Sequence, residues 1–383
     1  MKFQKLSDEE VVNTLYSSTP NIGQKIVNHT IVDMFYYGFA RTEVAYINFQ
    51  NRKGGSIYKP LEVEKIPSLK RASSTQFGFN TNIRDFLDER IQKQTIDFLH
   101  DTGTDVLRVE IPYTYLSKEN GRVNWRDIGK MMNTLDSKNI KIIAVLGDWI
   151  DGTHKPPKLE LFNPYVHRFA LTYGEQVIGY EVGNEPNHWP FWKGTPLDYI
   201  RLAKNAYQTI KTFDETAQVG INLCRLTEVR NRPWPFVFLD QLNIEGDVDL
   251  FDFIGIHGYP GTWEPGNAST WNRYLSEVDY WMSENNVSCK KLVTETGTTA
   301  SKWGKITGHT PEHQRDFIIE LAKIMKQWEI EIVSIYRALD LNKFSDSEPQ
   351  KYLPQEHHFG LQDKLGNSKL DGIEDILAET FHK

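Results

Sequence analysis

The chain has 383 residues, of which 39% are hydrophobic and 25% are charged, a composition typical of a folded globular protein. Asp and Glu total 51 against 44 Lys and Arg, which gives a formal net charge of −7. Nucleic-acid binding calls for a basic surplus, so the charge argues against nucleic acid as a partner. No stretch approaches the roughly 18 consecutive apolar residues of a membrane span, so we expect no membrane partner either.

Residues 1–70 do not follow the regular alternation of the rest of the chain. Their start lacks the apolar stretch of a signal peptide, which predicts a cytoplasmic protein, or a secreted one whose signal has been removed. Segments 43–49 and 56–63 flank a Gly-containing turn and indicate a hairpin. Because no linker-like composition follows, we expect residues 1–70 to be an extension that packs on a single domain formed by residues 71–383.

From residue 75 onward, short apolar runs alternate with helical patterns, which is typical of repeated βα units. The runs are apolar throughout, as expected of parallel strands that are covered on both faces. Eight strands with seven intervening helices favour a (β/α)8 barrel, a TIM barrel, with a doubly wound open sheet as the structural alternative. The eight predicted strands are 75–79, 105–111, 140–146, 177–182, 218–222, 251–257, 291–294 and 331–336.

Several helices carry recognisable start signals. Asn163-Pro164, Thr195-Pro196 and Thr310-Pro311 each pair a capping residue with a proline that suits the first helical position. We therefore predict that helices begin at these three places. The two cysteines, Cys224 and Cys289, form no Cys-x-x-Cys pair, and we expect both to be free thiols.

Catalytic groups of such a barrel come from the carboxyl ends of its strands. The fourth strand leads into Gly183-Asn184-Glu185-Pro186, and Glu295 follows the seventh. An isolated Glu at a strand end is ordinarily a solvated loop charge. Two of them at the mouths of the fourth and seventh strands face each other across a cleft, which suits cleavage of a glycosidic bond by an acid/base and a nucleophile.

Other polar residues occupy matching positions. His257 and Tyr259 end the sixth strand, beside the seventh, and Arg108 lies inside the apolar second strand. A cation in that position needs an anionic partner. Either Glu295 or Glu110 can supply the negative charge.

This set of residues resembles the retaining glycoside hydrolases of clan A, which carry catalytic glutamates on strands four and seven. The local sequence is most similar to families 39 and 5. The resemblance covers about residues 75–365, including the closing stretch HHFGLQD at 357–363. It implies that Glu185 is the acid/base and Glu295 the nucleophile, with their carboxyl groups about 5–5.5 Å apart.

The same resemblance implies roles for the neighbouring residues. Asn184 would bind the 2-hydroxyl of the sugar, and His257 would line the site. Tyr259 would orient Glu295, and Arg108 would keep it ionised, because a nucleophile must stay charged.

The eighth strand departs from the clan, which often has a Trp at its end. Here the sequence is Ile335-Tyr336-Arg337, without a Trp. Arg337 can contact an anionic group of the substrate, or it can pair with Asp340. The floor that this Trp gives the sugar subsite in the clan is therefore not predicted here.

Tryptophans follow several of the predicted strand ends. Sugar rings present apolar C–H faces that stack on aromatic planes, although packing within the loops is an equally simple role for each Trp. Together they favour a cleft for an oligosaccharide. The substrate-binding candidates of this kind are Trp149, Trp189, Trp263 and Trp303.

The predicted function is retaining hydrolysis of an oligo- or polysaccharide by double displacement. Two alternatives remain: a transglycosylase on the same scaffold, and a non-catalytic carbohydrate-binding barrel. We expect no metal and no cofactor, because no predicted helix carries a His-x-x-x-His spacing and the sequence has no Gly-rich phosphate loop.

Overall fold

The structure of the chain is a computed structural model. The expected extension, residues 1–70, lies outside the described residues, as do Trp149, Trp189 and Trp303. The described residues are 75–83, 85–111, 124–147, 156–188, 191–192, 194–224, 234–244, 248–263, 266–301, 309–340 and 357–382.

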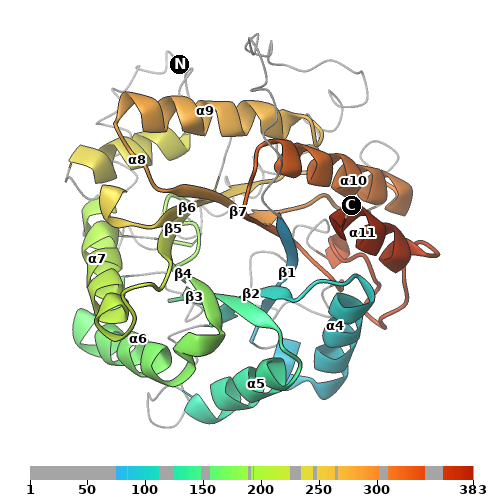
Figure 1. Cartoon of the computed structure of the whole chain (residues 1–383), viewed down its shortest axis with the longest axis horizontal. Helices are drawn as coiled ribbons and strands as arrows, with labels where there is room; N and C mark the ends of the chain where they lie inside the picture. Colours follow the sequence, from blue (N-terminus) through green and yellow to red (C-terminus); the bar gives the residue numbers. More distant parts are fainter. Residues whose placement is uncertain are drawn as a thin grey trace, which may run out of the picture.

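Eight parallel strands form a closed barrel in chain order, and β8 pairs with β1 to complete the ring (Figure 1). The predicted barrel is confirmed, and the open-sheet alternative is wrong, because an open sheet would leave β1 and β8 unpaired. The strands are β1 (Gln76–Asn82), β2 (Val106–Ile111), β3 (Lys141–Leu146), β4 (Val177–Val182), β5 (Val219–Cys224), β6 (Phe253–Gly258), β7 (Lys290–Thr296) and β8 (Ile332–Ile335).

The strand pairing is uneven around the ring. β2 and β3 are aligned over six residue pairs, whereas β4 and β5 are aligned over two, Tyr180 with Val219 and Glu181 with Gly220. The register between β7 and β8 also shifts along their contact. β4, which leads into the turn of Glu185, and β7, which contains Glu295, are thus each followed by a short or interrupted pairing.

Helices surround the barrel in the ring that Figure 1 shows. Thr195 and Thr310 cap α7 and α10 as predicted, each accepting a hydrogen bond from a backbone N–H of the first turn. The predicted start at Asn163 is wrong, since α6 begins at Leu159 and contains Pro164; burial of Phe162 favours the additional turn. The helices are α4 (Glu89–Asp101), α5 (Trp125–Ser137), α6 (Leu159–Tyr173), α7 (Pro196–Phe213), α8 (Trp234–Ile244), α9 (Thr270–Glu284), α10 (Pro311–Gln327) and α11 (Ile373–His382).

The inside of the barrel has two layers. Side chains two positions apart on a strand point the same way, so Val106 of β2 lies below Arg108 in the interior. An apolar layer of Val106, Ile143, Phe253, Leu292 and Ile332 fills the end at which the strands begin. Above it lies a buried polar layer, which is costly unless its members bond one another. That layer includes Asn80, Arg108, Glu181, Asn222 and Thr294.

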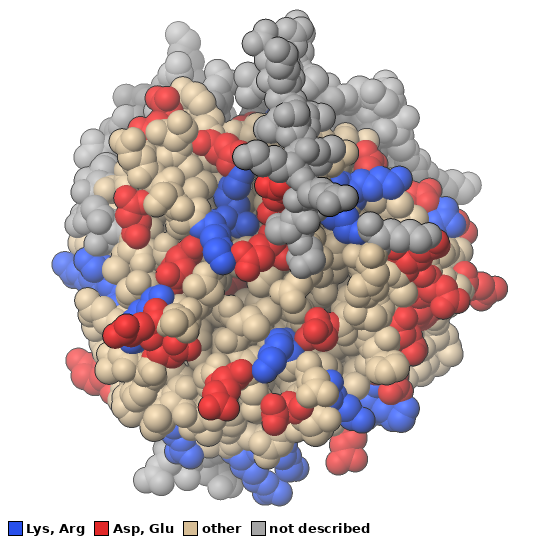
Figure 2. All heavy atoms as spheres, viewed as in Figure 1, with Lys and Arg blue, Asp and Glu red and all other residues tan. Residues whose placement is uncertain are grey.

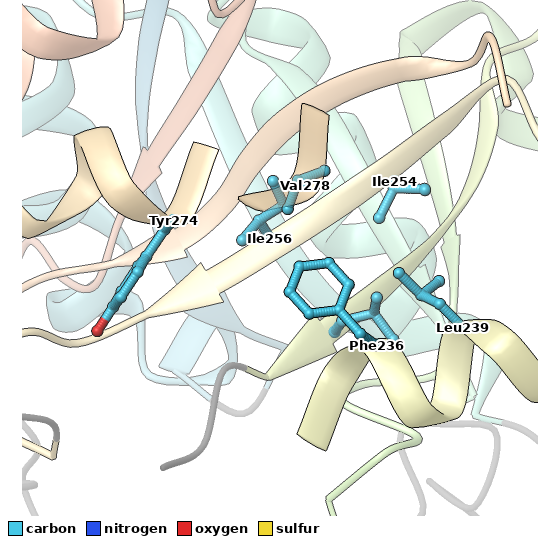
Figure 3. A pocket seen from close by; sticks show the side chains of 7 residues that line it. Phe236, Leu239, Ile254, Ile256, Tyr274 and Val278 are labelled. Atoms are coloured by element: carbon cyan, nitrogen blue, oxygen red, sulfur yellow. The ribbon is translucent and has the colours of Figure 1, made fainter. Parts of the chain in front are cut away.

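A small apolar cavity of about 20 Å³ lies outside the barrel wall. Figure 3 shows it between β6 and the helices α8 and α9. Its lining contains no charged residue, so it is a packing gap separate from the polar layer. The lining residues are Leu223, Phe236, Leu239, Ile254, Ile256, Tyr274 and Val278.

The face of the molecule in Figure 2 carries Lys and Arg side chains beside Asp and Glu side chains, without an extended basic patch among its described residues. Both cysteines are free thiols, as predicted. Among the described helices, none is long and apolar enough to cross a membrane.

Candidate active site

Arg108 links the polar residues at the carboxyl end of the barrel. Its side chain is 1% exposed, and Nε donates to Glu181 Oε2 at 2.7 Å. Nη1 donates to Glu295 Oε2 at 2.8 Å and to Asn80 Oδ1 at 3.1 Å. Nη2 donates to Asn184 Oδ1 at 2.8 Å. The predicted need of Arg108 for an anionic partner is therefore met by two buried carboxylates, Glu181 and Glu295.

Glu295 lies near the end of β7, and two side chains donate hydrogen bonds to its carboxylate. Besides Arg108, the hydroxyl of Tyr259 donates to Glu295 Oε1. Burial and the nearby charge of Glu295 raise the pKa of Tyr259 well above its ordinary value, so this hydroxyl keeps its proton. Edge-to-face contacts with the rings of Tyr336 and Phe359 hold the Tyr259 ring in place.

Glu185 lies in the turn after β4, with a left-handed backbone (φ +44°). Asn222 of β5 fixes this turn: its side-chain oxygen lies 2.6 Å from the Glu185 backbone nitrogen, which donates to it. Nδ1 of His257 lies 2.9 Å from one carboxylate oxygen, and Nδ1 of His188 lies 3.1 Å from the other. Burial alone would raise the pKa of Glu185, but the hydrogen bonds from the two histidines outweigh it and lower that pKa.

The two predicted catalytic carboxylates approach each other closely. A carboxylate oxygen of Glu185, one of Glu295 and a ring nitrogen of His257 lie within 4.8 Å of one another. Two like charges at this distance need compensation, which Arg108 gives to Glu295 and the histidine donors give to Glu185.

Two groups of side chains around Glu185 offer atoms of the kinds that bind metals. One is Glu185, His257 and Glu295, and the other is Glu185, His188 and Cys224, with the ligand atoms of each group within 4.8 Å of one another. The carboxylates and imidazoles in both groups also take part in the hydrogen bonds above, which account for their arrangement by themselves. The expectation of no metal stays a prediction.

The remaining predicted site residues fall into three groups. Arg337 is buried, and its guanidinium carbon lies 5.8 Å from the centre of the Tyr336 ring. The carboxylate of Asp340, the alternative partner of Arg337, instead binds Lys369 Nζ at 2.7 Å and the backbone N–H of Gly360 at 2.9 Å. Trp263 is half-buried, with its ring centre 6.2 Å from that of Phe359. Trp149, Trp189 and Trp303 lie outside the described residues.

Sequence reasoning missed several members of the network. Glu181 is a charge inside an apolar strand, the same signal that singled out Arg108, and the two form an ion pair. His188 follows Glu185 by three residues in the same turn. Asn80 and Asn222 are uncharged and gave no comparable signal.

Searches with the sequence find no matching family model and no matching curated protein. Solved structures do match. A β-xylosidase from Caulobacter crescentus CB15 is 20% identical, with a TM-score of 0.59 over 81% of this chain and 69% of that one. A GH39 enzyme from Xanthomonas axonopodis pv. citri is 15% identical, with a TM-score of 0.58 over 80% of this chain and 67% of that one.

A third match is a GH2 β-galacturonidase from Eisenbergiella tayi, at 13% identity and a TM-score of 0.56. The match covers 81% of this chain but 51% of the galacturonidase, so the chain spans about half of that protein. These likenesses confirm, for the fold, the resemblance to clan A glycoside hydrolases. The chain has the (β/α)8 barrel that these enzymes share.

Proposed function

We propose that the chain is a retaining glycoside hydrolase that cleaves an oligo- or polysaccharide by double displacement. The observation that carries this proposal is the pair Glu185 and Glu295, with carboxylate oxygens within 4.8 Å at the mouth of the barrel. Retaining enzymes have carboxyl groups about 5–5.5 Å apart, whereas inverting enzymes need about 6.5–9.5 Å to admit a water molecule between them. The contrasting hydrogen bonds of the two carboxylates support distinct roles.

In the first step Glu295 attacks the anomeric carbon, and the bond to the leaving oxygen breaks. Arg108 and Tyr259 suit this role, because Arg108 brings a positive charge to one carboxylate oxygen and the Tyr259 hydroxyl donates to the other. Glu185 gives its proton to the leaving oxygen. The product is a glycosyl ester on Glu295.

Glu185 must hold a proton for this step, although its histidine donors lower its pKa in the free protein. The glycosidic oxygen, on approaching the carboxyl group, takes the place of His188 as its hydrogen-bond partner. Losing that donor raises the pKa of Glu185 toward the value that an acid catalyst needs. In the second step Glu185 takes a proton from water, which attacks the anomeric carbon and releases Glu295.

Azide rescue of two variants tests these roles on an aryl glycoside with a good leaving group. Glu185→Ala should release a burst of phenol and then stall, because the ester forms but no base assists water. Added azide, which needs no base, should restore turnover and give a glycosyl azide of retained configuration. Glu295→Ala should be inactive, and azide should give the inverted product.

Glu175→Ala provides a matched control, since Glu175 is exposed and lies at the opposite end of β4. It should behave as the unchanged protein does. If the azide products had the opposite configurations, Glu185 would be the nucleophile and Glu295 the acid/base. Normal hydrolysis by both site variants would exclude this pair as the catalytic groups.

A further inference from the structure

A third carboxyl group, that of Glu110, lies in the mouth of the barrel. Glu110 is two residues after Arg108 on β2, so its side chain points the same way, one step nearer the carboxyl end of the strand. It is half-buried, in contrast to the fully buried Arg108. This placement puts the carboxyl group where the interior opens toward the cleft.

The carboxyl group of Glu110 differs from its neighbours in its bonding. Glu181, Glu185 and Glu295 each bind a cationic or N–H donor. Among the described residues, none forms a hydrogen bond or ion pair with the Glu110 side chain, whereas its backbone lies in the paired strands and its oxygen accepts a bond from the Ile83 N–H. Unlike Glu181 Oε1, the oxygens of Glu110 are not among the described buried atoms that lack a hydrogen-bond partner, so the carboxyl group remains accessible to a ligand.

The charges of the two proposed catalytic carboxylates act on Glu110. Burial raises its pKa to about 7; Arg108 and Arg337 act to lower it, and the charges of Glu295 and Glu185 act to raise it. At neutral pH the group is therefore present both as a carboxylate and as a carboxylic acid. It can accept a hydrogen bond from a hydroxyl group or donate one to it.

We propose that Glu110 binds a hydroxyl group of the sugar unit that lies against Glu185 and Glu295, and that it selects a neutral sugar over a uronic acid there. The proposal rests on the proposed function, because it takes the substrate to be a glycoside. A sugar hydroxyl supplies the partner that the Glu110 carboxyl group lacks within the described residues.

The charge balance gives the preference for a neutral sugar. In the described part of the barrel mouth, four carboxyl groups face two guanidinium groups. When Glu110 is ionised, it repels a carboxylate on the sugar unit that it contacts. The groups are Glu110, Glu181, Glu185 and Glu295 against Arg108 and Arg337.

The test is a double-mutant cycle between Glu110 and the substrate. A screen of aryl glycosides of neutral sugars first identifies the best substrate. Analogues of that substrate are then used, each of which lacks one hydroxyl group. Glu110→Ala should lower kcat/KM on the parent glycoside roughly 10- to 100-fold, the range for a hydrogen bond to a charged group. On one deoxy analogue Glu110→Ala should cause no further loss, because the contact is already missing. Glu110→Met, which has a similar length but cannot hydrogen-bond a sugar hydroxyl group, keeps the test valid if the alanine variant does not fold.

Two further measurements separate the possible outcomes. The control Glu175→Ala should leave every rate unchanged. Calorimetry measures the binding of the free neutral sugar, of its deoxy forms and of the matching uronic acid. These affinities give the same cycle without catalysis. Equal losses for the parent and all deoxy forms, or tighter binding of the uronic acid, would overturn the role of Glu110. Sugar binding that depends on Glu110, without hydrolysis of any glycoside, would overturn the proposed function alone.

Discussion

Replacing Arg108 by methionine tests how far one guanidinium holds the barrel mouth together. The substitution keeps an unbranched side chain but removes hydrogen bonds to Glu181, Glu295, Asn80 and Asn184. Two buried carboxylates then lose their cation. Breaking a buried ion pair by removing one partner costs about 3–5 kcal/mol. We expect Arg108→Met to lower the free energy of unfolding by at least this amount at pH 8.

Urea unfolding followed by circular dichroism measures this loss as a lower midpoint with an unchanged slope. At pH 5 the loss should be smaller, because protonation can remove an unpaired charge. The double variant Arg108→Met/Glu181→Gln should recover about 1–3 kcal/mol relative to Arg108→Met, since Gln carries no charge. A loss below about 1 kcal/mol at pH 8, or no recovery in the double variant, would refute the reasoning.

Three further predictions concern other parts of the molecule. Folding raises the pKa of Glu110 from 4.5 to about 7. The contribution of this group to the free energy of unfolding is therefore fully present below pH 4.5 and is lost as the pH rises through 7. Glu110→Gln should therefore be more stable than the unchanged protein at pH 8, by at most about 3 kcal/mol, and equally stable at pH 4, by urea unfolding. His188→Ala removes a donor that lowers the pKa of Glu185, so the basic limb of the kcat/KM profile should move to higher pH; a shift to lower pH would contradict this. Ile254→Val, beside the apolar cavity, should cost about 1 kcal/mol of stability and leave activity unchanged.

The sequence was sufficient to predict the barrel, because its strands are uninterrupted apolar runs at regular spacing. It also led to Glu185 and Glu295, since strand ends are where such a barrel carries chemistry. Figure 1 shows the ring of strands that this alternation predicts. The start of α6 was missed, because Asn163-Pro164 has the form of a cap and burial of Phe162 cannot be read from it.

The partners of Arg108 illustrate what the sequence left open. A buried cation requires an anion, but composition does not say which, and Glu110 and Glu295 were both candidates. Glu295 is bonded to Arg108, whereas Glu181, which was not considered, takes the Nε position. The carboxylate that binds the guanidinium is decided by the register between neighbouring strands and by the side-chain conformations. Neither can be predicted from the sequence of a single strand.

The uneven strand pairing divides the ring into two arcs, one from β8 through β1 to β4 and the other from β5 to β7. Glu185 stands on the first arc and Glu295 on the second. Two hydrogen bonds connect the arcs: Arg108 donates to Glu295, and Asn222 accepts from the backbone N–H of Glu185. These side-chain contacts add to the backbone pairing of the closed barrel in positioning the two carboxylates. The distance between the carboxylates decides between retention and inversion, so the stereochemical course of the proposed reaction also depends on residues that form no bond to the sugar's reacting carbon.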